Sequence, residues 1–184
     1  HLVHVSKEDI AILRSASVNA VHNPTSNLKL GSGIAPVPSM LDAGVNVALG
    51  TDGTASNNNL NMFEEIHLAA LLHKGVAQNP EYVTARQAFS MATSNGAAAI
   101  GFGNEAGVVK NGMKADIVLL DTDKPHLCPL NDPYSAVAYS AQGSDVDTVI
   151  ADGVILMENR ELKTIDEERI KYEAGKRAKR LANS

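Results

Sequence analysis

Apolar and polar residues alternate along the first half of the chain in a pattern that predicts strands followed by helices. Short, almost continuously apolar runs are typical of strands buried on both faces, and apolar residues at helical spacing predict helices. The predicted strands span residues 1–5, 18–21 and 45–49, and the predicted helices span residues 7–15, 38–43, 62–74, 84–91 and 97–100. This order fits a doubly wound sheet or part of a barrel, and periodicity does not separate the two.

Glycine and proline set the expected ends of these elements. Pro24 ends the second strand and is expected to open a long loop over residues 25–36. Gly44 is expected to end the second helix by taking the left-handed backbone conformation. Gly75 is expected to end the helix that begins at residue 62.

The second half of the chain has a different pattern, in which glycines separate short strands. One strand is expected at residues 115–121, and two more, at 146–151 and 154–157, flank Asp152-Gly153, a typical type I′ hairpin turn. A charged amphipathic helix follows over residues 167–182. We therefore divide the chain into an α/β part (residues 1–104), a β-rich segment (105–163) and a C-terminal helix (164–184).

Composition narrows the classes of partner and compartment. The net charge of −5 gives no reason to expect nucleic acid or an anionic membrane as a partner. No run approaches the ~20 apolar residues of a membrane span, and the single cysteine, Cys128, fits a reducing compartment. We expect a cytoplasmic protein that binds neither nucleic acid nor membrane.

The candidate chemistry centres on Asp52, which follows the apolar run at residues 45–49. In a parallel α/β barrel, a carboxylate at the end of a strand lies at the mouth of the active site, where it can bind a metal or accept a proton. The alternative is structural, because Asp-Gly is a common turn and Asp often caps a helix. A doubly wound nucleotide-binding domain is disfavoured, since no glycine-rich phosphate loop follows the first strand.

Several separated motifs, in the right order, resemble the amidohydrolase superfamily, and within it the aminohydrolase group of 5-methylthioadenosine/S-adenosylhomocysteine deaminases and chlorotriazine hydrolases. They are His22-Asn23-Pro24-Thr25-Ser26-Asn27-Leu28-Lys29-Leu30, the following Gly31-Ser32-Gly33-Ile34-Ala35-Pro36, Gly50-Thr51-Asp52-Gly53 with Ser56-Asn57-Asn58, and the run from Gly107 to Val118. The resemblance covers essentially the whole chain. It implies the C-terminal part of a (β/α)8 barrel, strands six to eight, followed by a small β-sandwich segment.

The resemblance also implies roles for individual residues. Asp52 corresponds to the aspartate that binds the metal and takes a proton from water, and His1 to a histidine that holds that water and the tetrahedral intermediate. His22, near the barrel mouth, is either a residue around the substrate or structural. Ser56 and Asn57 either shape the loop or cap the next helix. The implied cofactor is one divalent metal per complete site. Zinc is the usual metal of the family, and iron, manganese or nickel are the alternatives.

The resemblance implies a hydrolase that deaminates a purine nucleoside such as 5-methylthioadenosine or S-adenosylhomocysteine. Chlorotriazine hydrolysis, guanine or cytosine deamination, and a non-catalytic half-barrel interaction module are the alternatives. The family's His-x-His pair and its fifth-strand histidine are absent from this sequence, and His1 and His4 do not replace the pair because they are three residues apart. We therefore expect a fragment that is inactive alone, and that associates with a missing N-terminal part or with other copies of itself through open strand edges.

Overall fold

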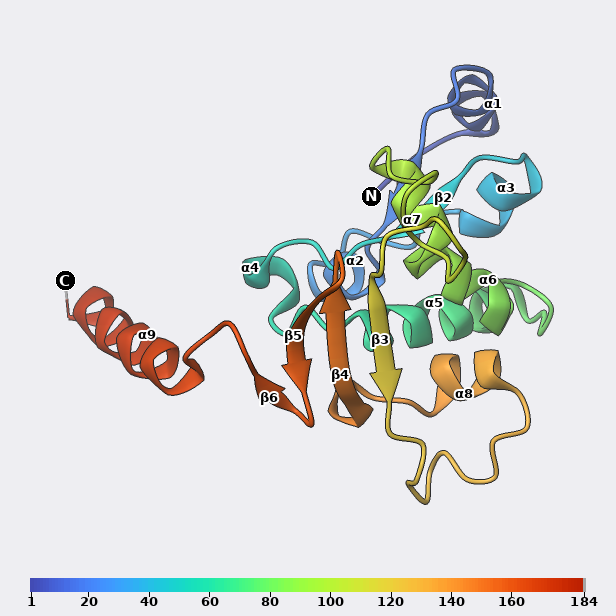
Figure 1. Cartoon of the computed structure of the whole chain (residues 1–184). Coiled ribbons are helices and arrows are strands. Elements are labelled where there is room, and N and C mark those ends of the chain that lie inside the picture. Colours follow the sequence, from blue (N-terminus) through green and yellow to red (C-terminus); the bar gives the residue numbers. More distant parts are fainter. Residues whose placement is uncertain (184) are drawn as a thin grey trace.

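The structure is a computed structural model that describes residues 1–183 (Figure 1). Its first half alternates helices with short strands, and its second half is built around an antiparallel sheet. The first half comprises α1 (Lys7–Ser15), β1 (Ala20–His22), α2 (Pro24–Lys29), α3 (Val37–Asp42), β2 (Val47–Leu49), α4 (Thr54–Asn57), α5 (Met62–Ala77), α6 (Ala85–Ala92) and α7 (Ser94–Ala99).

Strands β1 and β2 pair in parallel, with Ala20 opposite Val47 and His22 opposite Leu49. Parallel pairing brings the carboxyl ends of both strands to the same edge, so the residues that follow them become neighbours. The close approach needs Gly50, because a Cβ there would lie 2.8 Å from Asn23 Nδ2. This edge carries the candidate site.

The strand predicted at residues 1–5 was wrong, because these residues form turn and irregular backbone. A strand needs a neighbour to satisfy its backbone N–H and C=O groups, and the only parallel pair among the described residues is the one between β1 and β2. Apolar composition alone therefore did not make this segment a strand.

The hydrophobic core lies between the short parallel strands and the helices that cover them. Its buried members come mainly from α3, β2, α5 and α6, including Met40, Val47, Ile66 and Met91. Ala138 also belongs to this cluster, although it lies beyond the expected boundary at residue 105. The β-rich segment is thus anchored to the α/β part by shared core packing.

The second half comprises β3 (Ile117–Leu120), α8 (Pro133–Tyr139), the 3₁₀ turn η1 (Gly143–Asp145), β4 (Val146–Ala151), β5 (Val154–Glu158), β6 (Glu161–Leu162) and α9 (Glu167–Ala182). The strands form one antiparallel sheet in the order β3-β4-β5-β6. Asp152 and Gly153 both have positive φ, 48° and 79°, which confirms the predicted type I′ turn. Helix α8 packs on α5 and α6, whereas α9 extends away from the body of the chain (Figure 1).

Several predicted loops and ends were wrong. Residues 24–29 form helix α2 with Pro24 at its start, where the missing N–H costs nothing, so the loop predicted over residues 25–36 is shorter. Helix α5 continues through Gly75 and stops only at Gln78, which takes the left-handed conformation. Within residues 1–183, no helix is long and apolar enough to cross a bilayer.

Candidate active site

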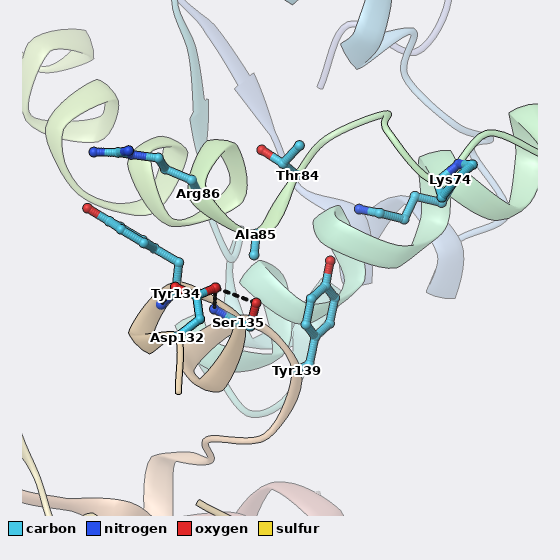
Figure 2. Close-up of a pocket in the computed structure, with 9 residues that line it drawn as sticks. Lys74, Thr84, Ala85, Arg86, Asp132, Tyr134, Ser135 and Tyr139 are labelled. Carbon is cyan, nitrogen blue, oxygen red and sulfur yellow. Dashed lines mark hydrogen bonds between the residues drawn. The ribbon is translucent and has the colours of Figure 1, made fainter. Parts of the chain in front are cut away.

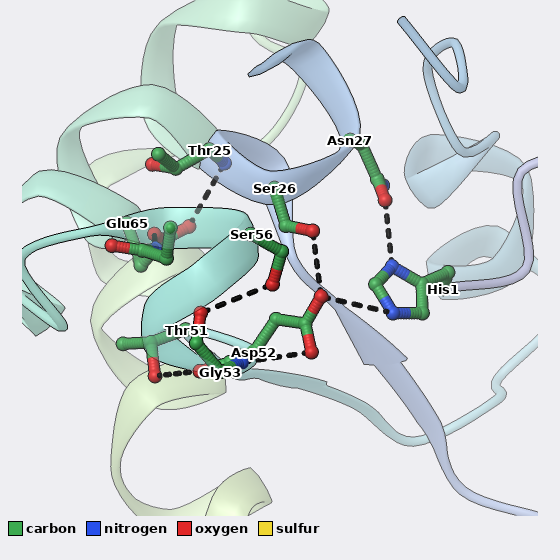
Figure 3. Close-up of polar contacts among 10 residues, drawn as sticks. His1, Thr25, Ser26, Asn27, Thr51, Asp52, Gly53, Ser56 and Glu65 are labelled. Carbon is green, nitrogen blue, oxygen red and sulfur yellow. Dashed lines mark hydrogen bonds and ion pairs between the residues drawn. The ribbon is translucent and has the colours of Figure 1, made fainter. Parts of the chain in front are cut away.

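Asp52 lies just after β2, in the turn that leads into α4. Its φ of +62° is unusual for a residue with a side chain, and the turn is held by bonds to its own neighbours. The Gly53 amide donates to Asp52 Oδ1 at 2.8 Å, and the Thr51 hydroxyl donates to the Asp52 carbonyl oxygen at 3.0 Å. These bonds fix one carboxylate oxygen and leave the other facing α2 and His1 (Figure 3).

Residues of α2 and the chain's first residue meet at that second oxygen. The Ser26 hydroxyl donates to Asp52 Oδ2 at 2.7 Å, and His1 Nε2 lies 3.6 Å from the same atom. On its other side, His1 Nδ1 lies 2.7 Å from Asn27 Oδ1. With Nδ1 donating to this oxygen, a neutral His1 presents the lone pair of Nε2 toward the carboxylate. Two acceptors then converge on one region, an arrangement suited to a water molecule or a cation.

Hydrogen bonds keep the Asp52 carboxylate ionised. The hydroxyl of Ser26 and the amide of Gly53, which both donate to its carboxylate, hold the pKa of Asp52 below its usual range. Hydrogen bonds to the charged form favour that form. At neutral pH this side chain can therefore accept a proton or bind a cation.

The structure separates Ser56 from Asn57, although both lie in α4. Ser56 is beside Asp52, and its hydroxyl donates to the Gly53 carbonyl oxygen at 3.0 Å. Asn57 is buried and points elsewhere, donating from Nδ2 to Glu65 Oε1 at 2.6 Å. Glu65 was not among the predicted site residues, because acidic residues in the first turn of a helix are usually exposed.

His22 is placed against α5, where its ring meets that of His73. Its ring centroid lies 5.2 Å from that of His73, and both side chains are buried. Neither ring nitrogen of His22 has a hydrogen-bond partner among residues 1–183. Burial, with the neighbouring His73, lowers the pKa of His22 to about 3, and burial lowers that of His73 to about 4. His22 therefore lies in a buried pair with His73, and its role as a residue around the substrate or a structural one stays a prediction.

A cavity of about 410 Å³ lies elsewhere, between α5, α6 and α8 (Figure 2). Its charged groups are already engaged. Lys74 donates to the carbonyl oxygens of Ala70 and Val83, and the guanidinium of Arg86 lies 4.9 Å from the ring centroid of Tyr134. We therefore place the candidate site at Asp52, where polar atoms converge without fully satisfying one another.

The donor set fits only part of a metal site. Asp52 offers a carboxylate oxygen and His1 an imidazole nitrogen, both suitable for zinc. Within residues 1–183, no three His, Cys, Asp or Glu side chains gather to hold a metal ion. Catalytic zinc takes three protein ligands. The described residues therefore form no complete zinc site.

Residues 1–156 match the model of the amidohydrolase family. The chain belongs to this family. It is 66% identical over 181 residues to a protein of Acetivibrio thermocellus named 5-methylthioadenosine/S-adenosylhomocysteine deaminase. The aligned residues cover 98% of this chain and 42% of that relative. A protein of the same name from Caldanaerobacter subterraneus is 57% identical with the same coverage. This amidohydrolase chain thus spans less than half the length of the relatives it matches.

Solved structures have the same fold over this length. An adenosine deaminase from Xanthomonas campestris with bound zinc superposes with a TM-score of 0.97 at 35% identity, covering 100% of this chain and 42% of its own. An atrazine chlorohydrolase from Arthrobacter aurescens complexed with zinc superposes with a TM-score of 0.88 at 32% identity. That match covers 94% of this chain and 38% of the chlorohydrolase chain. The expected family resemblance is confirmed.

Proposed function

We propose that this chain is the C-terminal part of a metal-dependent aminohydrolase that removes the amino group from a purine nucleoside such as 5-methylthioadenosine or S-adenosylhomocysteine. The convergence of His1 Nε2 and Asp52 Oδ2, 3.6 Å apart at the carboxyl end of β2, carries this proposal. The names of relatives at 57–66% identity support the substrate class.

The proposed chemistry assigns proton transfer to the two side chains. Asp52, kept ionised by Ser26, would take a proton from the attacking water, and His1 would hold that water through Nε2. A divalent metal, with Asp52 as one ligand, would supply the acidity that makes hydroxide available near neutral pH. Zinc is proposed because similar structures contain it, with iron, manganese and nickel as alternatives.

In this proposal β1 and β2 are the seventh and eighth strands of a (β/α)8 barrel. Residues 1–104 would belong to the barrel, 105–163 to a β-sandwich and 164–184 to the C-terminal helix, of which Ser184 lies outside the described residues. The remaining ligands and strands would come from a preceding segment, in a cytoplasmic enzyme that forms homo-oligomers. The core that Ala138 shares with α5 and α6 supports packing between these parts.

Triazine hydrolysis is the alternative with structural support, because a triazine hydrolase superposes with a TM-score of 0.87 at 33% identity. The higher identity to deaminase-named relatives favours the purine substrate. Guanine or cytosine deamination and a non-catalytic interaction module are further alternatives.

The test is a fusion protein that joins the preceding part of the Acetivibrio thermocellus relative to this chain. We expect the zinc-loaded fusion to release ammonia from 5-methylthioadenosine and S-adenosylhomocysteine, and the 184-residue chain alone to release none. Ammonia from guanine or cytosine, or chloride from atrazine, measured in parallel identifies the other substrates. A folded, zinc-loaded fusion that acts on none of these compounds would contradict the proposed function and support the interaction module.

A further inference from the structure

Helix α5 buries the carboxylate of Glu65 completely, with an exposed fraction of 0%. Burying an ionisable group is costly unless hydrogen bonds compensate it. Two donors do so here: Asn57 Nδ2 reaches Glu65 Oε1 at 2.6 Å, and the Thr25 amide reaches Oε2 at 3.1 Å. Each oxygen therefore holds a different segment of the chain.

The Thr25 amide belongs to the first turn of α2, whose amides have no partner within the helix. The next residue, Ser26, donates to Asp52, and the one after it, Asn27, contacts His1. The bond from Thr25 to Glu65 thus fixes the backbone that presents both partners of the candidate site (Figure 3).

The other oxygen fixes the far end of the turn that contains Asp52. Asn57 is the last residue of α4, and its Oδ1 accepts the amides of Asn59 and Leu60 at 3.2 and 3.0 Å. Its side chain is therefore locked between the loop to α5 and the Glu65 carboxylate. Ser56, whose hydroxyl donates to the carbonyl oxygen of Gly53 next to Asp52, lies directly before it.

We propose that Glu65 is a positioning residue for the reaction at Asp52. It touches neither Asp52 nor His1 through any hydrogen bond described for it, but it holds the segments on both sides of them at a fixed separation. This inference rests on the proposed function, and it adds a residue whose effect on the reaction is exerted through Ser26, Asn27 and the turn at residues 53–57.

The arrangement of donors and acceptors allows an exchange experiment in the fusion protein. Glu65→Gln places an amide nitrogen against one of two donors, and Asn57→Asp places two carboxylates together. The double variant N57D/E65Q restores complementarity, since the new amide at position 65 can donate to the new carboxylate at position 57 and still accept from the Thr25 amide. Glu64→Gln is the matched control, because Glu64 is the neighbouring glutamate and is not buried.

We expect kcat to fall about 10- to 100-fold in each single variant, the range typical of residues that orient catalytic groups. KM should change less than threefold, E64Q should match the unsubstituted protein, and the double variant should recover kcat to within about threefold. If a single variant does not fold, Asn57→Ala replaces it with the same expectation for kcat; it removes the bond to Glu65 Oε1 together with the two bonds that Asn57 Oδ1 accepts from the Asn59 and Leu60 amides. A loss of thermal stability with unchanged kcat, or recovery of stability without recovery of kcat in the double variant, would overturn the proposal.

Zinc affinity, measured by chelator competition, separates this inference from the proposed function. If the unsubstituted fusion deaminates no purine, the proposed function fails while the positioning role is still tested. Zinc affinity that falls in the single variants and recovers in N57D/E65Q then supports positioning by Glu65. Zinc affinity that is equal in all variants overturns it.

Discussion

At the candidate site, Asp52 has one carboxylate oxygen held by its own turn and the other shared with Ser26 and His1. Replacing this side chain by Asn keeps its shape and removes its charge and its capacity to take a proton. We expect Asp52→Asn in the fusion protein to lower kcat by about 10²–10⁴-fold, the usual contribution of a positioned acid or base. Circular dichroism checks that the fold is retained, and activity within threefold of the parent would exclude Asp52 as the proton acceptor.

The buried histidine pair predicts a loss of stability in mild acid. His22 and His73 have pKa values of about 3 and about 4, below the usual 6.5, because burial disfavours their charged forms. Between pH 6.5 and these values the unfolded chain binds more protons than the folded one, so the free energy of unfolding falls as the pH falls. The expected loss is about 2 kcal/mol per imidazole at pH 5 relative to pH 7.

Urea denaturation of the fusion protein at pH 7 and pH 5 measures this loss. His22→Phe keeps a ring at the buried position and should remove about half of it. His4 is exposed and provides the control, because His4→Gln should leave the loss unchanged. An identical pH dependence in the His22 variant would show that this imidazole does not titrate on unfolding.

At the scale of elements, the contact between the ends of β1 and β2 has no room for a side chain at position 50. A Cβ on Gly50 would lie 2.8 Å from Asn23 Nδ2 and 3.0 Å from Val21 Cγ1. We expect Gly50→Ala to destabilise the protein by about 1–3 kcal/mol, the usual cost of overpacking. Gly75→Ala is the control, since a Cβ there meets nothing and Ala favours the helix by about 0.5–1 kcal/mol. Thermal denaturation should show a lower melting temperature for Gly50→Ala and a higher one for Gly75→Ala. Equal melting temperatures of the two variants would contradict this expectation.

Sequence patterns predicted the elements whose signals are local. The Asp152-Gly153 turn, the long helix beginning at residue 62 and the position of Asp52 after a buried strand were all predicted correctly. The strand at residues 1–5 was wrong because its formation depends on a neighbour that no local pattern reveals. Helix α8 was missed although Asp132 and Pro133 are typical of a helix start, since Asp132 caps the amides of Tyr134 and Ser135.

Less of the candidate site was predictable than of the fold. The motif resemblance indicated Asp52 and His1, but assigned no contact to Ser26 or Asn27. Their roles follow from the turn of α2, which places consecutive side chains against different partners. The carboxylate of Glu65 was missed altogether, because its two donors are 8 and 40 residues away in the sequence.

At the scale of the whole molecule, two parallel strands leave both outer edges of their sheet without a partner among the described residues. Such edges pair readily with other chains, and two strands alone are marginally stable. We expect the 184-residue chain alone to associate into mixed larger species, and the fusion protein to elute as a single species. Size-exclusion chromatography with light scattering distinguishes these results, and a stable, monodisperse monomer of the chain alone would contradict the expectation.

The strand pairing has a consequence for synthesis on the ribosome. Each described strand pairs with a strand next to it in the order of the sequence, so every pairing seen here forms from residues within this chain. Under the proposed arrangement, the earlier strands of the barrel would emerge first and stay open until this part has formed. The nascent protein would then close late, with its last strands, β1 and β2, pairing with each other and carrying Asp52 at their carboxyl ends.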